Sequence, residues 1–269
     1  MSEICKNCTE EITLNFCPNC GQKKAKRIDR TYIKDELQYT VLHMNKGFFY
    51  SIKKILRAPG KTAREFLEGN RVNHYKPILL VFVVSGISAF LTNFFIPHPE
   101  EIIAKYYEII SLKAPYNVRS LYAFIFKYQA IMMLIMVPYV AFFSWLVFRK
   151  WGYNYYENIV TTAFSLIFIQ VLSILIVFPF QYIFKDNPIL FMKIPMILTA
   201  ILGICAFPWF YINLYNKKVA GEVILKLFYF LIIFIIVSFI LCIIGGVALG
   251  FYLVNNNIDP NIFFGIKPT

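Results

Sequence analysis

Five long apolar runs restrict what this chain can fold into more than any other feature of its sequence. A helix of about twenty apolar residues spans the hydrocarbon core of a bilayer, and a helix satisfies its backbone hydrogen bonds internally where water is absent. The runs lie at about residues 78–96, 127–148, 159–184, 189–215 and 223–254. We therefore predict an all-α polytopic membrane protein with about five transmembrane helices.

The composition supports this class. The 269 residues are 58% hydrophobic and 16% charged, whereas a soluble globular domain has about 45–50% apolar and about 25% charged residues. The charge is also unevenly placed, because 15 of the 27 Lys and Arg residues precede the first apolar run. The apolar part and the basic part are therefore expected to occupy different environments.

Two CxxC pairs stand at the start of the chain. Their cysteines are Cys5, Cys8, Cys17 and Cys20. Two such pairs supply the tetrahedral set of four sulfur ligands that a structural Zn²⁺ binds. A head of about twenty residues cannot bury a useful core, so metal binding must supply its folding energy. We predict a zinc ribbon in which Gly21 shapes the second turn and residues 10–16 form a short hairpin.

Other interpretations of the cysteines fit less well. Two disulfides would require an oxidising compartment. A redox site needs one CxxC pair at a helix, usually within a βαβ unit, and not two matched pairs on turns. Four thiolate ligands leave no open coordination position, so we interpret the zinc as structural and not catalytic.

The distribution of Lys and Arg predicts the orientation. With the N-terminus inside and Lys127, Lys193 and Lys226 at span ends left uncounted, the inner segments hold 19 Lys and Arg residues and the outer segments hold 5. This agrees with the excess of positive charge on cytoplasmic loops. We therefore expect a cytoplasmic N-terminus and an outside C-terminus. The basic tract before the first run favours the bilayer surface and its anionic headgroups as partner over nucleic acid.

The stretch between the ribbon and the first run shows helical periodicity. Within residues 31–75, Ile33, Leu37, Val41 and Leu42 lie on one face of a first helix. A second stripe consists of Phe48, Phe49, Ile52, Ile55 and Leu56 beside Lys53, Lys54 and Arg57. This pattern is typical of helices that lie in the headgroup plane. The alternative is a small soluble collar that packs on the spans. We expect three parts: a ribbon over 1–22, a basic linker with juxtamembrane amphipathic helices over 23–76, and a transmembrane domain over 77–269.

One polar cluster precedes the first span. It contains Arg64, Glu65, Glu68, Arg71, Asn73, His74 and Tyr75. The candidate surface or partner site consists of Arg57, Arg64, Glu68, Arg71, His74 and Tyr75. A Glu–His pair at a membrane surface could perform acid–base chemistry, and a lipid-modifying enzyme that uses Glu68, Arg71 and His74 is one hypothesis. The sequence has no HExxH motif, serine elbow or phosphate-binding Gly loop. We therefore interpret the cluster as a surface or partner site, and we expect that the protein is not an enzyme.

The spans carry few polar groups. The strongly polar side chains in or near them are Asn93, Gln129, Gln170, Gln181 and Asn213, which we expect to form hydrogen bonds between helices. The prolines within the spans are Pro138, Pro179, Pro195 and Pro208. Because broken helices can form a substrate path, a facilitator of small solutes or lipids is the alternative function.

Two stretches resemble a known family. The first is Phe16-Cys17-Pro18-Asn19-Cys20-Gly21-Gln22; the second runs from Arg57-Ala58-Pro59-Gly60 through Arg64-Glu65-Phe66-Leu67-Glu68-Gly69-Asn70-Arg71 to Tyr75-Lys76-Pro77. Together they resemble the bacterial membrane family filed as domain of unknown function 3667, with a zinc ribbon, an "R-P-G … Y-x-x-G-x-R … Y-x-x-P" segment and several spans. Ala58 interrupts the R-P-G element, and Phe66 stands where Tyr is expected. The resemblance covers about residues 5–96 and implies a bacterial inner-membrane protein, but no activity.

These observations lead to one preferred function. We expect an integral membrane protein whose cytoplasmic ribbon and basic collar dock a protein partner or the membrane surface, or hold its own membrane domain in register. The sequence leaves homo-oligomer formation open.

Overall fold

The computed structural model describes residues 3–13, 15–24, 27–33, 47–110 and 117–256. Leu37, Val41 and Leu42 of the first predicted helix lie outside these residues. Within them, five helical segments are long and apolar enough to cross a membrane: Pro77–Phe95, Val118–Trp151, Tyr155–Ile183, Pro188–Leu214 and Ala220–Tyr252. The prediction of an all-α polytopic membrane protein with about five spans is confirmed.

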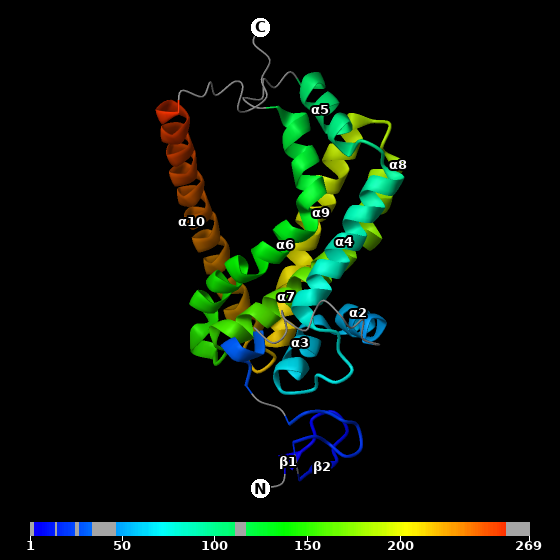
Figure 1. Ribbon diagram of the computed structural model, residues 1–269, viewed down its shortest axis with the longest axis vertical. Helices are drawn as coiled ribbons and strands as arrows, with labels where there is room; N and C mark the ends of the chain where they lie inside the picture. The colour runs from blue at the N-terminus through cyan, green and yellow to red at the C-terminus, as the bar shows by residue number, and fades with distance from the viewer. Residues whose placement is uncertain (1–2, 14, 25–26, 34–46, 111–116, 257–269) are drawn as a thin grey trace.

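The five spans run alternately between two ends of the molecule (Figure 1). They are α4 (Pro77–Phe95); α6 (Val118–Phe148) with the 3-10 turn η2 (Arg149–Trp151); α7 (Tyr155–Leu172) with the π-helical η3 (Ser173–Val177) and α8 (Phe178–Ile183); α9 (Pro188–Leu214); and α10 (Ala220–Asn255). The helix α5 (Pro99–Ile109) connects α4 to α6 at the end opposite the ribbon. The end that carries the N-terminal head is called the ribbon end below.

Local sequence signals set several helix ends. The Asn154 side chain accepts from the backbone N–H of Glu157, and the Glu157 carboxylate accepts from that of Asn154, which forms a capping box at the start of α7. The Asn117 side chain accepts from the N–H of Ser120, so α6 begins at Val118, nine residues before the predicted start of the second span. The apolar run marks only the part of α6 that suits the bilayer interior, whereas the cap decides where the helix begins.

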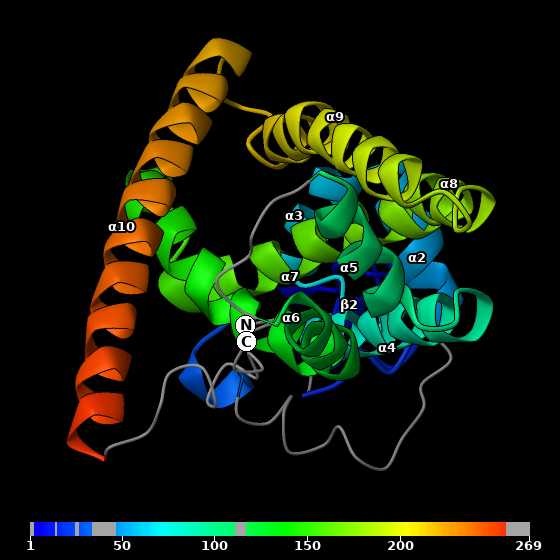
Figure 2. The same ribbon diagram turned by 90° about the horizontal axis from the view of Figure 1, so that it is seen from above.

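α7 is the central helix of the bundle (Figure 2), and nearly all of its side chains up to Val171 are buried. Its regular geometry changes at the π-helical stretch Ser173–Val177, just before Pro179. Proline removes a backbone donor and clashes with the preceding turn, and a π-bulge is one way in which a helix absorbs such a defect.

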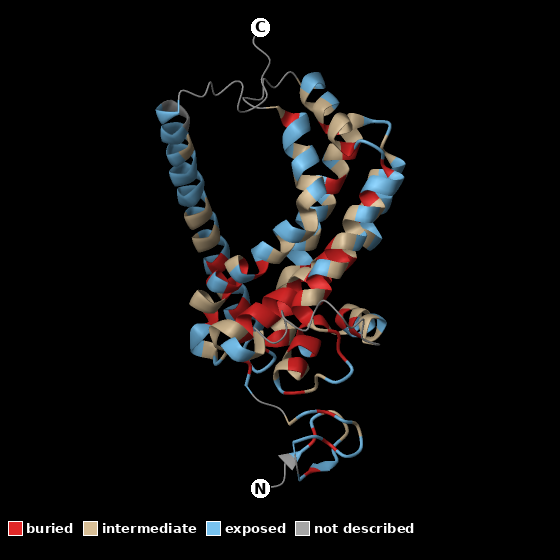
Figure 3. Cartoon of the chain, viewed as in Figure 1, coloured by how far each residue is buried: buried red, intermediate tan, exposed pale blue. Residues whose placement is uncertain are grey.

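Two short helices form the described part of the collar, residues 47–76. They are α2 (Phe48–Arg57) and α3 (Pro59–Leu67). Ile55 of α2 and Phe66 of α3 are almost fully buried in the same core cluster as Phe164 of α7 and Phe210 of α9. Buried residues gather at this ribbon end (Figure 3). The collar and the spans therefore share one hydrophobic core.

The fifth long helix, α10, packs only over its first half. Phe230 joins Val140 and Phe143 of α6 in a buried cluster, and the hydroxyls of Tyr139 and Ser238 lie 2.8 Å apart. Beyond this point α10 stands away from the other spans (Figure 1). Its apolar side chains there are exposed, which suits a helix surrounded by lipid.

The collar backbone approaches the backbone of α9 closely at Gly60. A Cβ at this position would overlap the carbonyl oxygen of Phe210 and the backbone nitrogen of Leu214 in α9. Pro59 fits the first turn of α3, where its missing N–H would be unpaired in any case. The Pro-Gly pair therefore starts α3 and lets it lie directly against α9.

We predict that Gly60→Ala destabilises the protein by about 1–3 kcal/mol, because the added methyl group must push α3 away from α9. The measurement is the melting temperature of the purified protein in detergent. Gly203→Ala is the matched control, since a Cβ at Gly203 meets nothing within 4 Å. Equal melting temperatures for the two variants would contradict the close approach.

Candidate metal centre

The ribbon is built on two paired strands. β1 (Glu3–Ile4) pairs antiparallel with β2 (Glu11–Ile12), with Glu3 opposite Ile12 and Ile4 opposite Glu11. A separate bridge pairs Phe16 with Lys23. The hairpin predicted within residues 10–16 is not observed among the described residues, because the segment pairs outward, with residues before the first and after the second CxxC pair.

The two CxxC turns have the same hydrogen bonds. The Cys5 N–H donates to Glu10 O (2.8 Å) and the Thr9 N–H to Cys5 O (2.9 Å); likewise the Cys17 N–H donates to Gln22 O (2.8 Å) and the Gly21 N–H to Cys17 O (2.9 Å). Thr9 and Gly21 occupy equivalent positions and both have left-handed backbones, with φ of 64° and 71°. The ribbon thus contains one turn twice, with glycine at the strained position in the second copy only.

The four cysteine sulfurs converge between these turns. Their ligand atoms all lie within 4.8 Å of one another, with Cys5 Sγ 3.6 Å from Cys20 Sγ and Cys8 Sγ 3.4 Å from Cys17 Sγ. A tetrahedral ion with metal–sulfur bonds of about 2.3 Å separates its sulfurs by about 3.8 Å, whereas a disulfide requires about 2.05 Å. The four cysteines are free thiols, and their spacing fits one metal ion.

A hydrogen bond from Asn7 also affects the ionisation of one candidate ligand, Cys20. It lowers the pKa of the Cys20 thiol to about 6, whereas burial and hydrogen bonds with the other three thiols raise the pKa of Cys8 to about 12. Thiolate is the form that binds metal, so Cys20 is the ligand most ready to bind. The Asn7 side-chain oxygen in turn accepts from Asn73 Nδ2 of the collar at 3.2 Å. One of the candidate ligands is therefore connected to the collar through a single amide side chain.

We predict that Gly21→Val accelerates metal loss from the ribbon, because a β-branched residue is strained at a left-handed backbone position. Thr9→Gly should slow metal loss for the same reason at the equivalent turn. The rate at which a chelator removes metal from the purified protein measures both effects. A Gly21→Val variant that retains metal as long as the wild type would contradict this account of the turns.

The ribbon also binds the collar directly through Gln22. Its Nε2 donates to Gly69 O, its Oε1 accepts from the Arg71 N–H at 3.4 Å, and the residue is only 3% exposed. A buried amide with both ends bonded holds its partners in one relative position. The sequence singles out Gln22 only as the residue after the second Cys-Gly turn, and its partner nearly fifty residues away could not be predicted.

The linker after the ribbon is anchored on the loop between α6 and α7. Arg27 donates from Nε and Nη2 to the two carboxylate oxygens of Glu157, each at 2.9 Å, and from Nη2 to Gly152 O at 2.9 Å. Asn154 Nδ2 donates to Ile28 O at 3.1 Å, and the Ile28 side chain is fully buried. A bidentate Arg–carboxylate pair sets geometry as well as attraction, so residues 27 and 28 are fixed on the bundle.

Two arginines of the predicted polar cluster cap helices. Arg64 Nη1 donates to Asn213 O (2.6 Å) and Leu214 O (3.1 Å) at the end of α9. Arg71 donates to Phe66 O (3.0 Å) and Leu67 O (3.3 Å) at the end of α3. Cations at a helix C-terminus satisfy its unpaired carbonyls and its negative dipole end. Both guanidinium groups therefore have a role in the fold.

The histidine of this cluster lies inside the protein. His74 is 6% exposed, and its ring packs edge-on against Tyr50, Phe66 and Phe164. Burial, followed by the charge of Lys54, lowers its pKa to about 4. Tyr75 is also buried, whereas Arg57 and Glu68 are exposed. The six predicted residues thus do not form a single surface.

Because His74 is neutral when folded and has an ordinary pKa near 6.5 when unfolded, it should make stability fall as the pH drops from about 6.5 to about 4. The expected loss at pH 5 relative to pH 7 is about 2 kcal/mol. His74→Leu should remove this component from a series of melting temperatures between pH 7 and pH 5. His98→Leu, at an exposed histidine, is the control, and parallel curves for the wild type and His74→Leu would refute the assignment.

Hydrogen bonds between spans follow the prediction only in part. Ser85 Oγ of α4 donates to Gln170 Oε1 of α7 at 2.9 Å, and Gln129 Nε2 of α6 donates to Ser88 Oγ of α4 at 3.3 Å. Asn93 and Asn213 instead bond to carbonyls of their own helices. A further buried group was not predicted: Ser144 Oγ lies 3.0 Å from Asn158 Oδ1 and 3.3 Å from the Tyr211 hydroxyl.

Comparison with known proteins adds one finding. Residues 45–89 match the model of the family described as "Protein of unknown function (DUF3667)". No curated protein and no solved structure matches the chain. The matched segment contains α2, α3 and the first part of α4, with Gly60, Arg64 and Arg71 at the contacts described above. The match falls within the stretch, about residues 5–96, over which the sequence resembles the DUF3667 family of proteins of unknown function.

Proposed function

We propose that this integral membrane protein is a non-enzymatic scaffold, whose cytoplasmic zinc ribbon and basic collar dock a protein partner at the membrane surface. Zn²⁺ is the metal that four thiolates at tetrahedral spacing suit best, and a closed set of four ligands gives it a structural role. When bound, the ion would be held by Cys5, Cys8, Cys17 and Cys20. It would stabilise the two turns that carry Asn7 and Gln22 toward the collar.

The arrangement of charge supports a cytoplasmic ribbon end. The turn after α6 carries Arg149 and Lys150, and Lys217 and Lys218 follow α9. These residues lie at the same end as the collar because the spans alternate in direction. An excess of Lys and Arg marks the cytoplasmic side, where thiols stay reduced and available to metal.

The observation that carries the proposal is the Gln22 contact. It holds the ribbon on the collar, while Ile4 and Phe16 of the ribbon remain 63% and 57% exposed. Large apolar side chains on a small, rigid head are suited to contact another protein. A head held in this way presents those side chains in a fixed direction relative to the bilayer, which lowers the entropic cost of binding.

The collar offers a second contact, with anionic headgroups. α2 buries Ser51 and Ile55 against the spans, but leaves Phe49 82% exposed. Lys53, Lys54 and Arg57 on the same helix are exposed as well. An exposed aromatic ring beside basic side chains is typical of a helix at the bilayer interface.

The polar cluster before the first span supports a role without catalysis. Arg64 and Arg71 are engaged by helix ends, and His74 is enclosed by aromatic rings. A general base must reach a substrate proton, and the burial of His74 does not favour that use.

The proposal is tested by crosslinking in intact cells that express the full chain, with the captured proteins identified after purification. Ile4→Ser/Phe16→Ser should reduce capture of the principal partner several-fold and leave metal content unchanged. Cys17→Ser/Cys20→Ser should abolish both. Gln22→Ala should keep the metal but increase hydrogen exchange around residues 69–71, with Asn19→Ala, at an exposed turn position, as its control. An unchanged partner set in the Ile4→Ser/Phe16→Ser and cysteine variants would overturn the docking role.

A further inference from the structure

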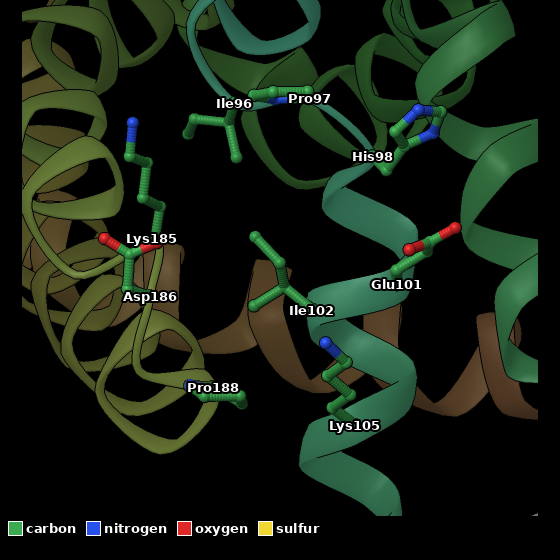
Figure 4. Close-up of a pocket in the computed structure, with 9 residues that line it drawn as sticks. All are labelled: Ile96, Pro97, His98, Glu101, Ile102, Lys105, Lys185, Asp186 and Pro188. Carbon is green, nitrogen blue, oxygen red and sulfur yellow. The ribbon is translucent and has the colours of Figure 1, made fainter.

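A cavity of about 500 Å³ lies at the end of the molecule opposite the ribbon. Three elements border this partly open cavity: the end of α4, the first two turns of α5, and the connection from α8 to α9 (Figure 4). Its lining residues are Ile96, Pro97, His98, Glu101, Ile102, Lys105, Lys185, Asp186 and Pro188. A volume of this size is in the range of sites that hold small molecules or lipid headgroups.

The charges around this cavity favour an anion. Within the part of the chain that the structure describes, neither Lys105 nor Lys185 has an ion pair. The carboxylate of Glu101, in contrast, is engaged by Arg119 and points away from the α8–α9 connection in Figure 4. Asp186 remains at the exposed rim. Two lysines therefore line the cavity, and Asp186 is the one lining carboxylate that Arg119 does not neutralise. The net charge around the cavity is positive.

The backbone adds to the positive electrostatic potential at the cavity. α5 begins at Pro99 and α9 begins at Pro188, so two helix N-termini lie at the cavity. The N-terminus of a helix carries a partial positive charge and favours phosphate. His98, the residue before α5, has a left-handed backbone with φ of 54°, which is uncommon outside glycine. This conformation turns the chain sharply after α4 and brings the start of α5 to the cavity.

The walls and surroundings are apolar, which distinguishes an amphiphile from a soluble ion. Ile96, Ile102 and Pro188 line the cavity itself. Phe95, which precedes the lining residue Ile96 in the chain, has its ring 5.9 Å from that of Tyr182, so that the two rings join α4 to α8. Phe95 is 41% exposed, Tyr182 44% and Ile183 64%. All three lie within three residues of a cavity-lining residue, Ile96 or Lys185, so exposed apolar side chains stand beside the cavity.

We propose that this cavity binds the phosphate-bearing headgroup of a membrane lipid. Lys105 and Lys185 contact the phosphate, and the acyl chains lie along Phe95, Tyr182 and Ile183. Asp186 accepts a hydrogen bond from a hydroxyl or ammonium of the headgroup at the rim. With the ribbon in the cytoplasm, the lipid belongs to the outer leaflet.

The test measures retained lipid by native mass spectrometry on the purified full chain, with equal amounts of phosphatidylglycerol and a neutral glycolipid present. The wild type should retain phosphatidylglycerol selectively. Lys105→Gln/Lys185→Gln should reduce this retention about tenfold or more, since each lysine near an anionic lipid contributes about fivefold in affinity. Lys150→Gln/Lys217→Gln, which removes two exposed lysines at the ribbon end, is the matched control and should change nothing.

A second arm separates a lipid from a free anion. Phe95→Ser should weaken retention of phosphatidylglycerol, and millimolar inorganic phosphate should fail to displace the lipid from the wild type. If inorganic phosphate displaces the lipid completely, the site binds a soluble anion and the lipid proposal is overturned. Equal retention by the Lys105→Gln/Lys185→Gln variant and its control would overturn the site altogether.

Discussion

The approach of α3 to α9 at Gly60 is the contact on which the ribbon end of this protein depends. Only glycine allows the two backbones to come so close, and the approach brings Arg64 within reach of the last carbonyls of α9. It also seats Phe66 against Phe164 of the central helix. Once α3 is placed, the loop that follows it is placed as well, and that loop carries the Gln22 contact with the ribbon.

The ribbon end thus joins four separate stretches of the chain. A metal ion at the cysteines would order two turns, Gln22 and Asn7 extend from them to the collar, and Arg27 extends from the linker to the α6–α7 loop. Each contact joins residues that are close in space but far apart in the sequence. The opposite end is different in character, since it contains a partly open cavity with two lysines that have no ion pair among the described residues.

Much of the fold could be predicted because its causes are local. Apolar runs identify spans whatever their neighbours are, and the CxxC spacing identifies four ligands because each turn forms within a few residues. The polar cluster was harder to interpret. The sequence identifies Arg64, Arg71 and His74 only as polar residues near a membrane span. In the structure, Arg64 bonds to a carbonyl of α9 and Arg71 to one of α3, whereas His74 packs against an aromatic ring of α7. The prediction of a hairpin within residues 10–16 was wrong for a related reason, because residues 11 and 12 pair with a strand that precedes the first cysteine pair.

The sequence by itself determined the class of the protein: an apolar helical part that crosses a bilayer about five times, a four-cysteine head and a basic stretch between them. These features follow from residue type and short-range spacing, which a chain carries before it folds. Only the tertiary structure decided that the head rests on the collar through Gln22, that α7 is the centre of the bundle, and that Lys105 and Lys185 face one cavity. Those outcomes depend on which distant surfaces come together. They are governed by packing and by the pairing of buried polar groups across the whole molecule.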